Sequence, residues 1–331
     1  MSNNPLKSNK LKIRNSKFIL GETVEQLSKL ETNSVDMAFC DPPYYLQLSR
    51  TLYRPDQTRV SGVDDKWDQF KSYQDYDNFS KKWLLHIKRI LKPNATIWVI
   101  GTYHNIYRIG YLMQNFNFWI LNDLTWRKTN PMPNFKGTRF TNAHENLIWA
   151  SKSKDSKYTF NYKTMKLMNN NKQMRSDWLI NVCNGKERLK DKNNNKLHNA
   201  QKPEQLLERI VLASTRVGDL VLDPFFGTGT TGVVCKRLGR KFIGIERESS
   251  YLVAAKERIL KIKRLQSKNL EDITSDYKEK RIAFSNLLKK GLIKPGNTLY
   301  DSRKKIKATV LSNGSLKFKN DTGSIHKIGA I

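Results

Sequence analysis

Two kinds of apolar spacing alternate along the first 265 residues. Short apolar runs typical of buried strands are followed by longer segments in which apolar residues return every third or fourth position, as on one face of a helix. The expected strands are 18–20, 35–39, 96–100, 119–126, 147–150, 220–222 and 242–245, and the expected helices are 24–30, 79–91, 105–115, 204–215, 233–238 and 251–265. This alternation predicts an α/β fold, with a parallel sheet and helices on both of its faces.

Three segments interrupt the alternation and are expected to be long loops. Residues 46–75 show little periodicity, and residues 126–142 contain two closely spaced prolines, which exclude a helix. Residues 151–200 are rich in lysine and contain two runs of asparagine, so we interpret them as a surface excursion and not as a domain. Loops of this length in a compact domain are usually functional or disordered.

The pattern changes near the C-terminal end. Residues 276–288 are expected to form a helix, and Asn313-Gly314, between two apolar segments, is typical of a β-hairpin turn. We therefore expect a first domain over residues 1–270 and a small α+β appendage over residues 271–331. Lysines make the appendage basic, which fits DNA contact and a solvated surface equally well: Lys304, Lys305, Lys307, Lys317, Lys319 and Lys327.

A short motif follows the strand expected at 35–39. The sequence Asp41-Pro42-Pro43-Tyr44 stops that strand, because proline cannot donate a hydrogen bond to a strand ladder. Asp41 and Tyr44 are then presented at the carboxyl end of a strand, where open α/β sheets bind ligands. Taken alone, the motif is better interpreted as an ordinary Asp-Pro-Pro turn with a partly buried tyrosine.

A second motif follows the strand expected at 220–222. Gly227, Gly229 and Gly232 have the spacing of a nucleotide-binding glycine turn, and Glu246 closes the next expected strand. A carboxylate in that place accepts hydrogen bonds from ribose hydroxyls, which suits either a dinucleotide or S-adenosylmethionine. Asp223 favours S-adenosylmethionine, because a carboxylate beside the turn attracts its cationic amino-acid part and repels a pyrophosphate.

The net charge indicates a polyanionic partner. The chain has 60 Lys and Arg against 30 Asp and Glu, a formal charge of +30, and nucleic acid best matches such an excess. No apolar run approaches the ~18 residues of a membrane span, and the N-terminus lacks a signal-peptide core. Cys40, Cys183 and Cys235 have neither disulfide nor zinc-ligand spacing, and the five histidines are scattered. We expect a cytoplasmic protein with reduced thiols and no metal.

The two motifs together resemble those of the DNA methyltransferases that methylate amino groups. Asp41-Pro42-Pro43-Tyr44 precedes the stretch from Asp223 to Thr230, which is the permuted order of their β class. The likeness to the cell-cycle-regulated adenine methyltransferase (CcrM) and HinfI group covers most of the chain and includes residues 46–48, 53–56, 126–135, 142–145, 173–178 and 185–190. Two departures are Tyr45, where the group usually has Asn, and Asn199-Ala200, where it usually has Pro-Thr.

The resemblance implies a Rossmann-like, S-adenosylmethionine-dependent methyltransferase sheet and a DNA adenine-N6 methyltransferase. The implied catalytic residues are Asp41, Pro42, Pro43 and Tyr44. Asp41 and the Pro42 carbonyl would accept the N–H groups of the target amine, and Tyr44 would stack on a base taken out of the duplex. The implied cofactor-binding residues are Cys40, Lys202, Asp223, Pro224, Phe225, Phe226, Gly227, Thr228, Gly229, Thr230 and Glu246. The implied DNA-binding residues are Arg54, Trp126, Lys128, Asn130, Asn134, Arg139 and Arg175.

The implied partners are S-adenosylmethionine and double-stranded DNA. The three long loops, 46–75, 126–142 and 151–200, would read the DNA together with the basic appendage. The group methylates the adenine of GANTC, and we expect the same site here, in a restriction-modification or solitary enzyme associated with the bacterial nucleoid. A homodimer remains open.

Other functions stay open at this point. Methylation of cytosine N4, RNA or protein is the nearest alternative, although RNA and protein methyltransferases normally carry Asn in place of Asp41. A non-catalytic nucleic-acid binder would keep the positive charge and lose the motifs. A NAD-dependent oxidoreductase would use the same glycine turn and would bind NAD in place of S-adenosylmethionine.

Overall fold

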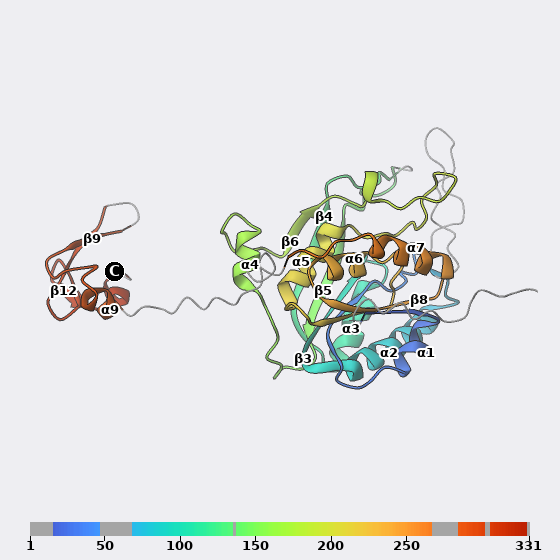
Figure 1. Cartoon of the computed structure of the whole chain (residues 1–331), viewed down its shortest axis with the longest axis horizontal. Coiled ribbons are helices and arrows are strands. Elements are labelled where there is room, and N and C mark those ends of the chain that lie inside the picture. The colour runs from blue at the N-terminus through green and yellow to red at the C-terminus, as the bar shows by residue number, and fades with distance from the viewer. Residues whose placement is uncertain (1–15, 47–67, 135–136, 267–283, 302–304, 330–331) are drawn as a thin grey trace, which may run out of the picture. The chain divides into compact units, whose positions relative to one another are not determined.

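The computed structural model of the protein describes residues 16–46, 68–134, 137–266, 284–301 and 305–329. The chain divides into two compact units, Met1–Ser275 and Asp276–Ile331. Figure 1 shows the second unit in the red colours of the C-terminal end. Each unit has its own sheet; the first has two buried apolar clusters and the second has one.

The first unit is built around a mixed sheet. Among the described residues its eight strands lie in the order β1-β8-β7-β2-β3-β5-β4-β6. Their bounds are β1 Lys17–Leu20, β2 Val35–Cys40, β3 Leu91–Gly101, β4 Trp119–Lys128, β5 His144–Ser151, β6 Asp177–Ile180, β7 Leu220–Asp223 and β8 Lys241–Glu246. Every strand expected from the apolar runs is present, and the α/β class is confirmed.

Two features of the sheet correct the sequence analysis. The sheet is not entirely parallel, because β5 pairs antiparallel with both β3 and β4. The segment 151–200 is also more than a surface excursion, since β6 pairs with β4 and buries Trp178 and Ile180. A short strand with two buried apolar residues, set among polar turns, gives too weak a pattern to be recognised from sequence.

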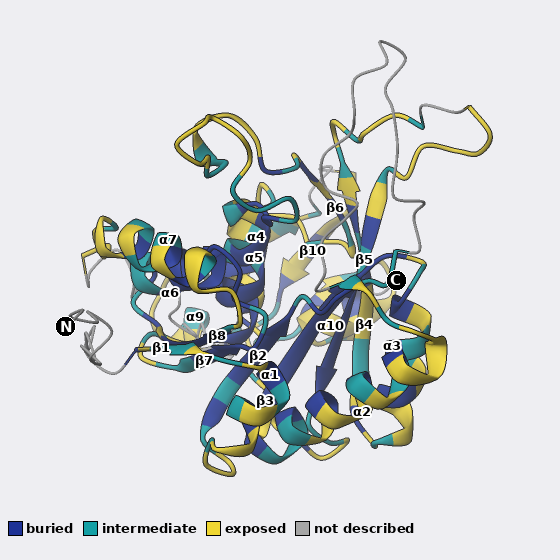
Figure 2. Ribbon diagram, turned by 90° about the vertical axis from the view of Figure 1, so that its right-hand side faces the viewer, coloured by how far each residue is buried: buried dark blue, intermediate teal, exposed yellow. Residues whose placement is uncertain are grey.

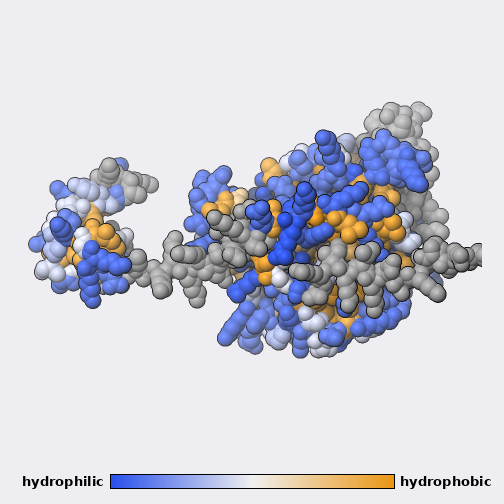
Figure 3. Space-filling model, in the orientation of Figure 1, coloured by the Kyte–Doolittle hydropathy of each residue, from blue (hydrophilic) through white to orange (hydrophobic). Residues whose placement is uncertain are grey.

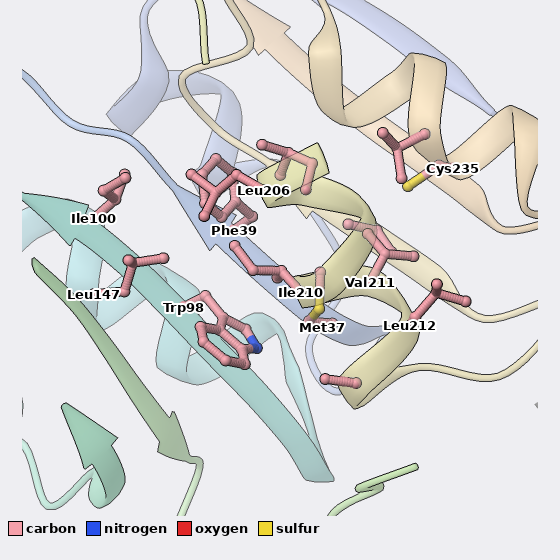
Figure 4. Close-up of a cluster of buried hydrophobic side chains, with 14 of the residues drawn as sticks. Met37, Phe39, Trp98, Ile100, Leu147, Leu206, Ile210, Val211, Leu212 and Cys235 are labelled. Atoms are coloured by element: carbon pink, nitrogen blue, oxygen red, sulfur yellow. The ribbon is translucent and has the colours of Figure 1, made fainter. Parts of the chain in front are cut away.

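Helices cover both faces of the sheet (Figure 2). Their bounds are α1 Thr23–Ser28, α2 Tyr73–Ile90, α3 Ile106–Asn115, α4 Tyr162–Leu167, α5 Glu204–Ser214, α6 Thr230–Arg237 and α7 Ser249–Leu260. Alternate residues of β2 serve the two faces: Met37 and Phe39 pack with α5, α6 and α7, whereas Ala38 and Cys40 pack with α1, α2 and α3. Figure 4 shows Phe39 against Leu206 of α5.

Helix α2 begins at Tyr73, earlier than the expected start at residue 79. Ser72 caps it, because its hydroxyl oxygen accepts the N–H of Asp75 at 3.1 Å. The first turn carries one buried residue, Tyr76, among polar ones, so the apolar period is visible only further along. Within the described part of the chain, no helix is both long and apolar enough to cross a membrane.

The second unit is a small α+β domain. Strands β9 Thr298–Tyr300, β10 Lys307–Val310, β11 Leu316–Phe318 and β12 Asp321–Gly323 form an antiparallel sheet, accompanied by helices α9 Phe284–Lys289 and α10 Ile325–Ile328. Ala308, Val310, Leu316 and Ile328 form its buried cluster. The hairpin predicted around Asn313-Gly314 is confirmed as β10–β11. Residues 276–283 of the predicted helix lie outside the described residues. Hydrophilic side chains dominate the face of the unit seen in Figure 3.

Candidate active site

Three neighbouring strands end at one edge of the first sheet. The strands β2, β7 and β8 lie side by side and run parallel. From β2 the chain continues to β3 on one side of the β2–β7 pair, and from β7 it continues to β8 on the other side. Open α/β sheets bind ligands at such a switch point, outside the carboxyl ends of the strands. Asp41 follows β2, Asp223 ends β7 and Glu246 ends β8. A cavity of about 2290 Å³ opens at this edge and is lined by residues of both sequence motifs.

The loop after β2 is held by side chains from other segments. Asp68 accepts three consecutive backbone N–H groups: those of Tyr44 at 2.6 Å, Tyr45 at 2.7 Å and Leu46 at 2.9 Å. The hydroxyl of Tyr76 donates to the Pro43 carbonyl at 2.8 Å, and the amide of Asn105 supports that hydroxyl at 3.1 Å. These contacts fix the backbone that presents the motif to the cavity.

Tyr45 has a left-handed backbone, with φ of 54°. Among non-glycine residues, Asn tolerates this conformation best, which explains why Asn is the usual residue here in the resembling group. Tyr45 offers aromatic packing instead, with ring centroids 5.6 Å from Phe70, 5.3 Å from Tyr73 and 6.0 Å from Tyr76. Aromatic packing thus surrounds the strained residue at this departure from the group's sequence.

A network of opposite charges lies at the base of the cavity. The Tyr44 hydroxyl is 3.0 Å from Asp41 Oδ1 and 2.9 Å from Glu145 Oε2. The Lys202 ammonium is 2.8 Å from Asp41 Oδ2, and the Lys128 ammonium is 2.8 Å from Glu145 Oε1. The two lysine side chains are only 8% and 13% exposed. Two carboxylates and two ammonium groups thus balance each other where little water reaches.

Burial and charge act differently on the ionisable groups of this network. Burial raises the pKa of Asp41, and Lys202 opposes only part of that rise. Burial would also raise the pKa of Glu145, but the charges of Lys202 and Lys128 outweigh it and hold that pKa below its usual value. Burial and the two carboxylates raise the pKa of Tyr44 well above its usual value, so its hydroxyl stays protonated.

Asp223 holds the glycine loop from inside. Its carboxylate accepts the N–H of Phe225 at 3.0 Å and the hydroxyl of Thr231 at 2.6 Å, and the residue is 3% exposed. Burial raises the pKa of Asp223 to about 7. Both carboxylate oxygens of Asp223 thus accept hydrogen bonds that shape the loop, and its expected attraction for a cationic ligand stays a prediction.

Phe226 supports the same loop from below. A Cβ at Gly232 would come within 2.7 Å of its ring, and one at Gly244 within 2.5 Å, so glycine is required at both positions. Gly229 has φ of +76°, which side chains rarely adopt. The large cavity is lined by Pro224, Phe225 and Gly227, whereas Phe226, Thr228, Gly229 and Thr230 act on it through the shape of the turn. Cys40 is fully buried beneath it.

Glu246 faces the open part of the cavity. Its carboxylate accepts the N–H of Gly227 at 2.7 Å and the N–H of Glu248 at 2.8 Å. The backbone N–H of Arg247 also interacts with this carboxylate, and since an ionised carboxylate has about four lone-pair sites, one remains for a hydroxyl donor of a ligand. Phe225 lies beside it with an aromatic surface. A nucleoside fits this combination, because one of its ribose hydroxyls can donate to the carboxylate and its base can pack on the aromatic ring. In the described part of the chain, no group of three or more His, Cys, Asp or Glu side chains could hold a metal ion.

His198 completes this half of the cavity. Its ring packs edge-on against Tyr251, with centroids 4.7 Å apart, and its Nδ1 accepts the N–H of Ala200 at 3.1 Å. Burial, with the charges of Lys202 and Arg188, lowers the pKa of His198 to about 4, so the imidazole is neutral near pH 7. Lys202, expected at the cofactor, has its ammonium on Asp41 instead.

Two residues expected to touch DNA belong to the interior. Trp126 is 2% exposed, and its Nε1 donates to the Ile180 carbonyl at 2.9 Å. Lys128 is bound to Glu145. Both lie on β4, which runs two residues further than the apolar pattern indicates, because its last residues pair with β5 and β6. Both side chains therefore have partners inside the protein and also line the large cavity, and their contact with DNA stays a prediction.

The other expected DNA-binding residues lie in several places. Asn130, Asn134 and Arg139 line the large cavity, and Arg139 donates to the Tyr103 hydroxyl at 2.9 Å. Arg175 is exposed, forms an ion pair with Asp177 at the start of β6, and is not among the residues that line the cavity. Arg54 lies outside the described residues.

Three residues of the site are absent from the sequence-based set: Glu145, His198 and Phe140. Glu145 is buried at the start of β5, and it reaches the site only because that strand runs antiparallel. Phe140 is 98% exposed at the cavity, which no hydropathy pattern distinguishes from a core residue. The stretch Asn142-Ala143-His144-Glu145 of the resembling group was the available signal for Glu145.

Comparisons with known proteins agree with this geometry. A family model described as DNA methylase matches residues 35–257. The type II methyltransferase M.HinfI of Haemophilus influenzae is 48% identical over 313 residues, which is 95% of this chain and 87% of that protein. The type II methyltransferase M2.DpnII of Streptococcus pneumoniae is 44% identical over 247 residues, 74% of this chain and 90% of that protein.

Solved structures show the same fold. The M1.HpyAVI–SAM complex superposes with a TM-score of 0.54 at 26% identity, covering 73% of this chain and 98% of the other. The cytosine-N4-specific PvuII DNA methyltransferase has a TM-score of 0.58 at 19% identity, covering 78% of this chain and 91% of the other, and shows the fold alone. The resemblance found in the motifs is confirmed. The chain belongs to the DNA methylase family, and it is a methyltransferase that uses S-adenosylmethionine.

Proposed function

We propose that this enzyme methylates the N6 amine of adenine in duplex DNA. The carrying observation is that Asp41 and Tyr44 share one cavity with Phe225, Gly227 and Glu246. An acceptor for amine hydrogens thus lies beside a nucleoside-binding surface. The 48% identity to M.HinfI over nearly the whole chain supports the same chemistry.

The residues at the base of the cavity suit an amine that must be made nucleophilic. The lone pair of adenine N6 is delocalised into the ring, and it becomes available when both N–H groups are held by acceptors. Asp41 would accept one and the Pro42 carbonyl the other, which is preorganised electrostatic assistance combined with alignment. S-adenosylmethionine supplies a methyl group bound to a sulfonium. When it is bound, an N–C bond would form as the C–S bond breaks, leaving S-adenosylhomocysteine, and the methylated nitrogen would release one proton to solvent.

The position of Tyr44 suits a base that has left the duplex. Its ring is held at both ends, by Asp68 on the backbone N–H and by carboxylates at the hydroxyl. Aromatic side chains stack on extruded bases in enzymes that modify them. The Lys202 ammonium now lies 5.1 Å from the centre of this ring, so a base entering the cavity would meet a preformed cationic and aromatic surface.

We propose that the cavity rim reads the sequence GANTC. Asn134 and Arg139 line the rim, and such side chains match the edges of adenine and guanine respectively. Phe140 is fully exposed beside them, which suits a wedge between bases. The segment 46–75, of which 47–67 lie outside the described residues, and Arg54 within it remain candidates for the same role.

The second unit offers an independent DNA surface. Lys307 pairs with Tyr300, and Thr309 pairs with Lys317, so these residues share the exposed face of its sheet. Tyr300 is 60% exposed on the edge strand β9, beside Lys307. Cations for phosphates beside an aromatic ring for stacking are the usual means of binding nucleic acid. We propose that this basic sheet face adds affinity for DNA.

The test is to identify the methylated base. The full-length protein is incubated with isotope-labelled S-adenosylmethionine and duplexes that contain GANTC or single-base variants of it, and the digested nucleosides are separated. N6-methyladenine confined to GANTC supports the proposal. Formation of N4-methylcytosine would instead show that cytosine is the target. Label on RNA or protein alone would show that DNA is not the substrate. A homodimer and a place at the nucleoid in the cytoplasm stay predictions.

A further inference from the structure

A buried lysine is paired with the carboxylate that would act on the target amine. The Lys202 ammonium is 2.8 Å from Asp41 Oδ2, and the two side chains are 8% and 16% exposed. The same ammonium lies 3.3 Å from the Ala200 carbonyl oxygen and 5.1 Å from the centre of the Tyr44 ring. Lysine is almost never buried to this extent unless its charge is compensated, so the burial of Lys202 depends on its carboxylate partners.

Two further carboxylates lie around Asp41. The Tyr44 hydroxyl is 3.0 Å from Asp41 Oδ1 and 2.9 Å from Glu145 Oε2, so two carboxylates meet at one neutral group. Asp223, at the end of the neighbouring strand β7, also interacts electrostatically with Asp41. Among the described residues, Lys202 is the cation that forms an ion pair with Asp41.

We propose that Lys202 is a positioning residue for methyl transfer: its ammonium holds Asp41 Oδ2 and keeps the carboxylate ionised among its negative neighbours, so that Asp41 accepts an N–H of the target amine. This inference rests on the proposed amine methylation. A protonated carboxyl group presents an O–H donor where an ionised one presents only acceptors. An ammonium on Oδ2 weakens the bonds that Asp41 accepts, but less than protonation would, so the benefit of Lys202 is greatest on the acid side.

The ionisable groups around Asp41 decide the sign of the effect. Burial is the largest influence and raises the pKa of Asp41, and the charge of Glu145 raises it further, whereas the charge and hydrogen bond of Lys202 lower it. Removing Lys202 should therefore raise this pKa. Tyr44 and Cys40 stay protonated, because burial raises the pKa of both.

Two other groups near Lys202 are distinguishable from Asp41. Burial raises the pKa of Asp223 to about 7, and Lys202 is not among the main causes, so an acid limb set by Asp223 would stay in place without Lys202. Burial, followed by the charges of Lys202 and Arg188, lowers the pKa of His198 to about 4. Removing Lys202 should raise that pKa, but a cationic His198 would favour ionised Asp41, so His198 opposes the predicted change and does not imitate it.

The first variant is Lys202→Met, which keeps the length of the side chain and removes its charge. Single-turnover methyl transfer is measured against pH at saturating S-adenosylmethionine. The acid limb should move to higher pH, and at the midpoint of the wild-type limb the rate should fall about tenfold, the value of one hydrogen bond to a charged group. At alkaline pH, where Asp41 is again ionised, the rate and the cofactor Kd should both lie within about threefold of wild type.

The decisive comparison adds Glu145→Gln to Lys202→Met. The charge of Glu145 raises the pKa of Asp41, and Glu145→Gln keeps an amide oxygen for Lys128, which lies 2.8 Å from Oε1. The acid limb of the double variant should therefore lie at lower pH than that of Lys202→Met. A merely structural role of Lys202 predicts no such return, because a second substitution then only adds damage. The two changes form a double-mutant cycle on one ionisable group.

Lys92→Met is the matched control. Lys92 pairs with Asp36 at 2.7 Å, on the same strand β2 but away from the cavity, so this substitution removes an ion pair of the same kind outside the site. It should alter neither the acid limb nor the rate at alkaline pH. Lys202→Arg, which keeps the charge, should retain the acid limb of the wild type even where its rate is lower.

A Lys202→Met acid limb at the wild-type pH, or a double variant whose limb does not return, would overturn the role of Lys202. So would a cofactor Kd raised more than about tenfold with the limb unmoved, which would place Lys202 on the carboxylate of S-adenosylmethionine. Breaking a buried ion pair is strongly destabilising. If melting temperatures show that Lys202→Met has lost its fold, the double variant is compared with Glu145→Gln alone and should have its acid limb at higher pH. Formation of N4-methylcytosine by the wild type would instead refute the adenine assignment and leave the test of Lys202 intact.

Discussion

Replacing Asp68 should disable the catalytic loop while sparing the cofactor half of the cavity. Asp68→Ala removes the acceptor of three backbone N–H groups, from Tyr44, Tyr45 and Leu46. Each bond to a charged group contributes roughly 1.5–3 kcal/mol. The three bonds share one carboxylate in a partly exposed place, so water replaces part of the loss, and we take about 3 kcal/mol as the total.

The free energy lost on replacing Asp68 should act mainly on the loop at Tyr45, because Tyr45 has a left-handed backbone. That conformation costs about 1–2 kcal/mol for a residue with a Cβ, and Asp68 is what holds it. With about 1.4 kcal/mol per factor of ten, the fraction of molecules with an ordered loop should fall by up to about a hundredfold. Asp68→Asn should be intermediate, because the retained oxygen still accepts two of the three N–H groups.

The assay is single-turnover methyl transfer to duplex DNA at saturating cofactor, together with the S-adenosylmethionine Kd. The rate should decrease in the order wild type, Asp68→Asn, Asp68→Ala. The Kd should change less than about threefold, since Glu246, the carboxylate proposed to bind ribose, is held by other backbone groups at the end of β8. In protein that also carries Tyr45→Asn, Asp68→Ala should lower the single-turnover rate by a smaller factor, because Asn tolerates φ of 54°. An equal cost in both backgrounds would refute the link to backbone strain.

Three further predictions concern the two halves of the site and the second unit. Asp41→Ala should abolish transfer and leave S-adenosylmethionine binding largely intact by calorimetry, and in the wild type the rate should decline as acidification protonates Asp41 at a pH above the usual range of a carboxyl, because burial raises its pKa. Glu246→Ala should weaken cofactor binding by about 1.5–3 kcal/mol through the lost bonds to ribose, and an unchanged Kd would remove Glu246 from the site. Deletion of residues 271–331 should lower the slope of log DNA affinity against log salt by roughly 0.9 per lost phosphate contact, with the cofactor Kd unchanged. An unaltered salt slope would make the second unit a solvated or assembly module.

Sequence pattern was sufficient for most of the first sheet, because its strands are nearly continuous apolar runs. It also placed Asp41 and Glu246 at strand ends, since a strand followed by proline or by a polar residue has a definite end. Strand direction was out of reach: nothing in the run 147–150 distinguishes an antiparallel strand from a parallel one. The position of Glu145 depends on that direction, and so it could not be predicted.

The roles of individual side chains were predicted less well than their neighbourhood. Asp223 and Phe226 belong to the cofactor motif, yet both are turned inward, because a tight glycine loop needs hydrogen bonds and packing beneath it. Trp126 and Lys128 belong to a stretch shared with the resembling group, and that likeness does not reveal their partners inside the protein, Ile180 and Glu145. Contacts such as Asp68 on the loop at Tyr44 join segments without periodicity, which leave no trace in the sequence.

The pairing of the early strands with the late ones sets when the enzyme can first become active. The strand that ends at the catalytic motif pairs with β7 through Met37 and Val221, and Ser16 accepts the N–H of Phe242, 226 residues further along the chain. Contacts so distant in sequence slow folding. During synthesis the edge of β2 that faces β7 remains without its neighbour until most of the chain has been made, and unpaired edges favour aggregation in that interval. The sheet edge at β2 is therefore completed only after residues 220–246 have been synthesised.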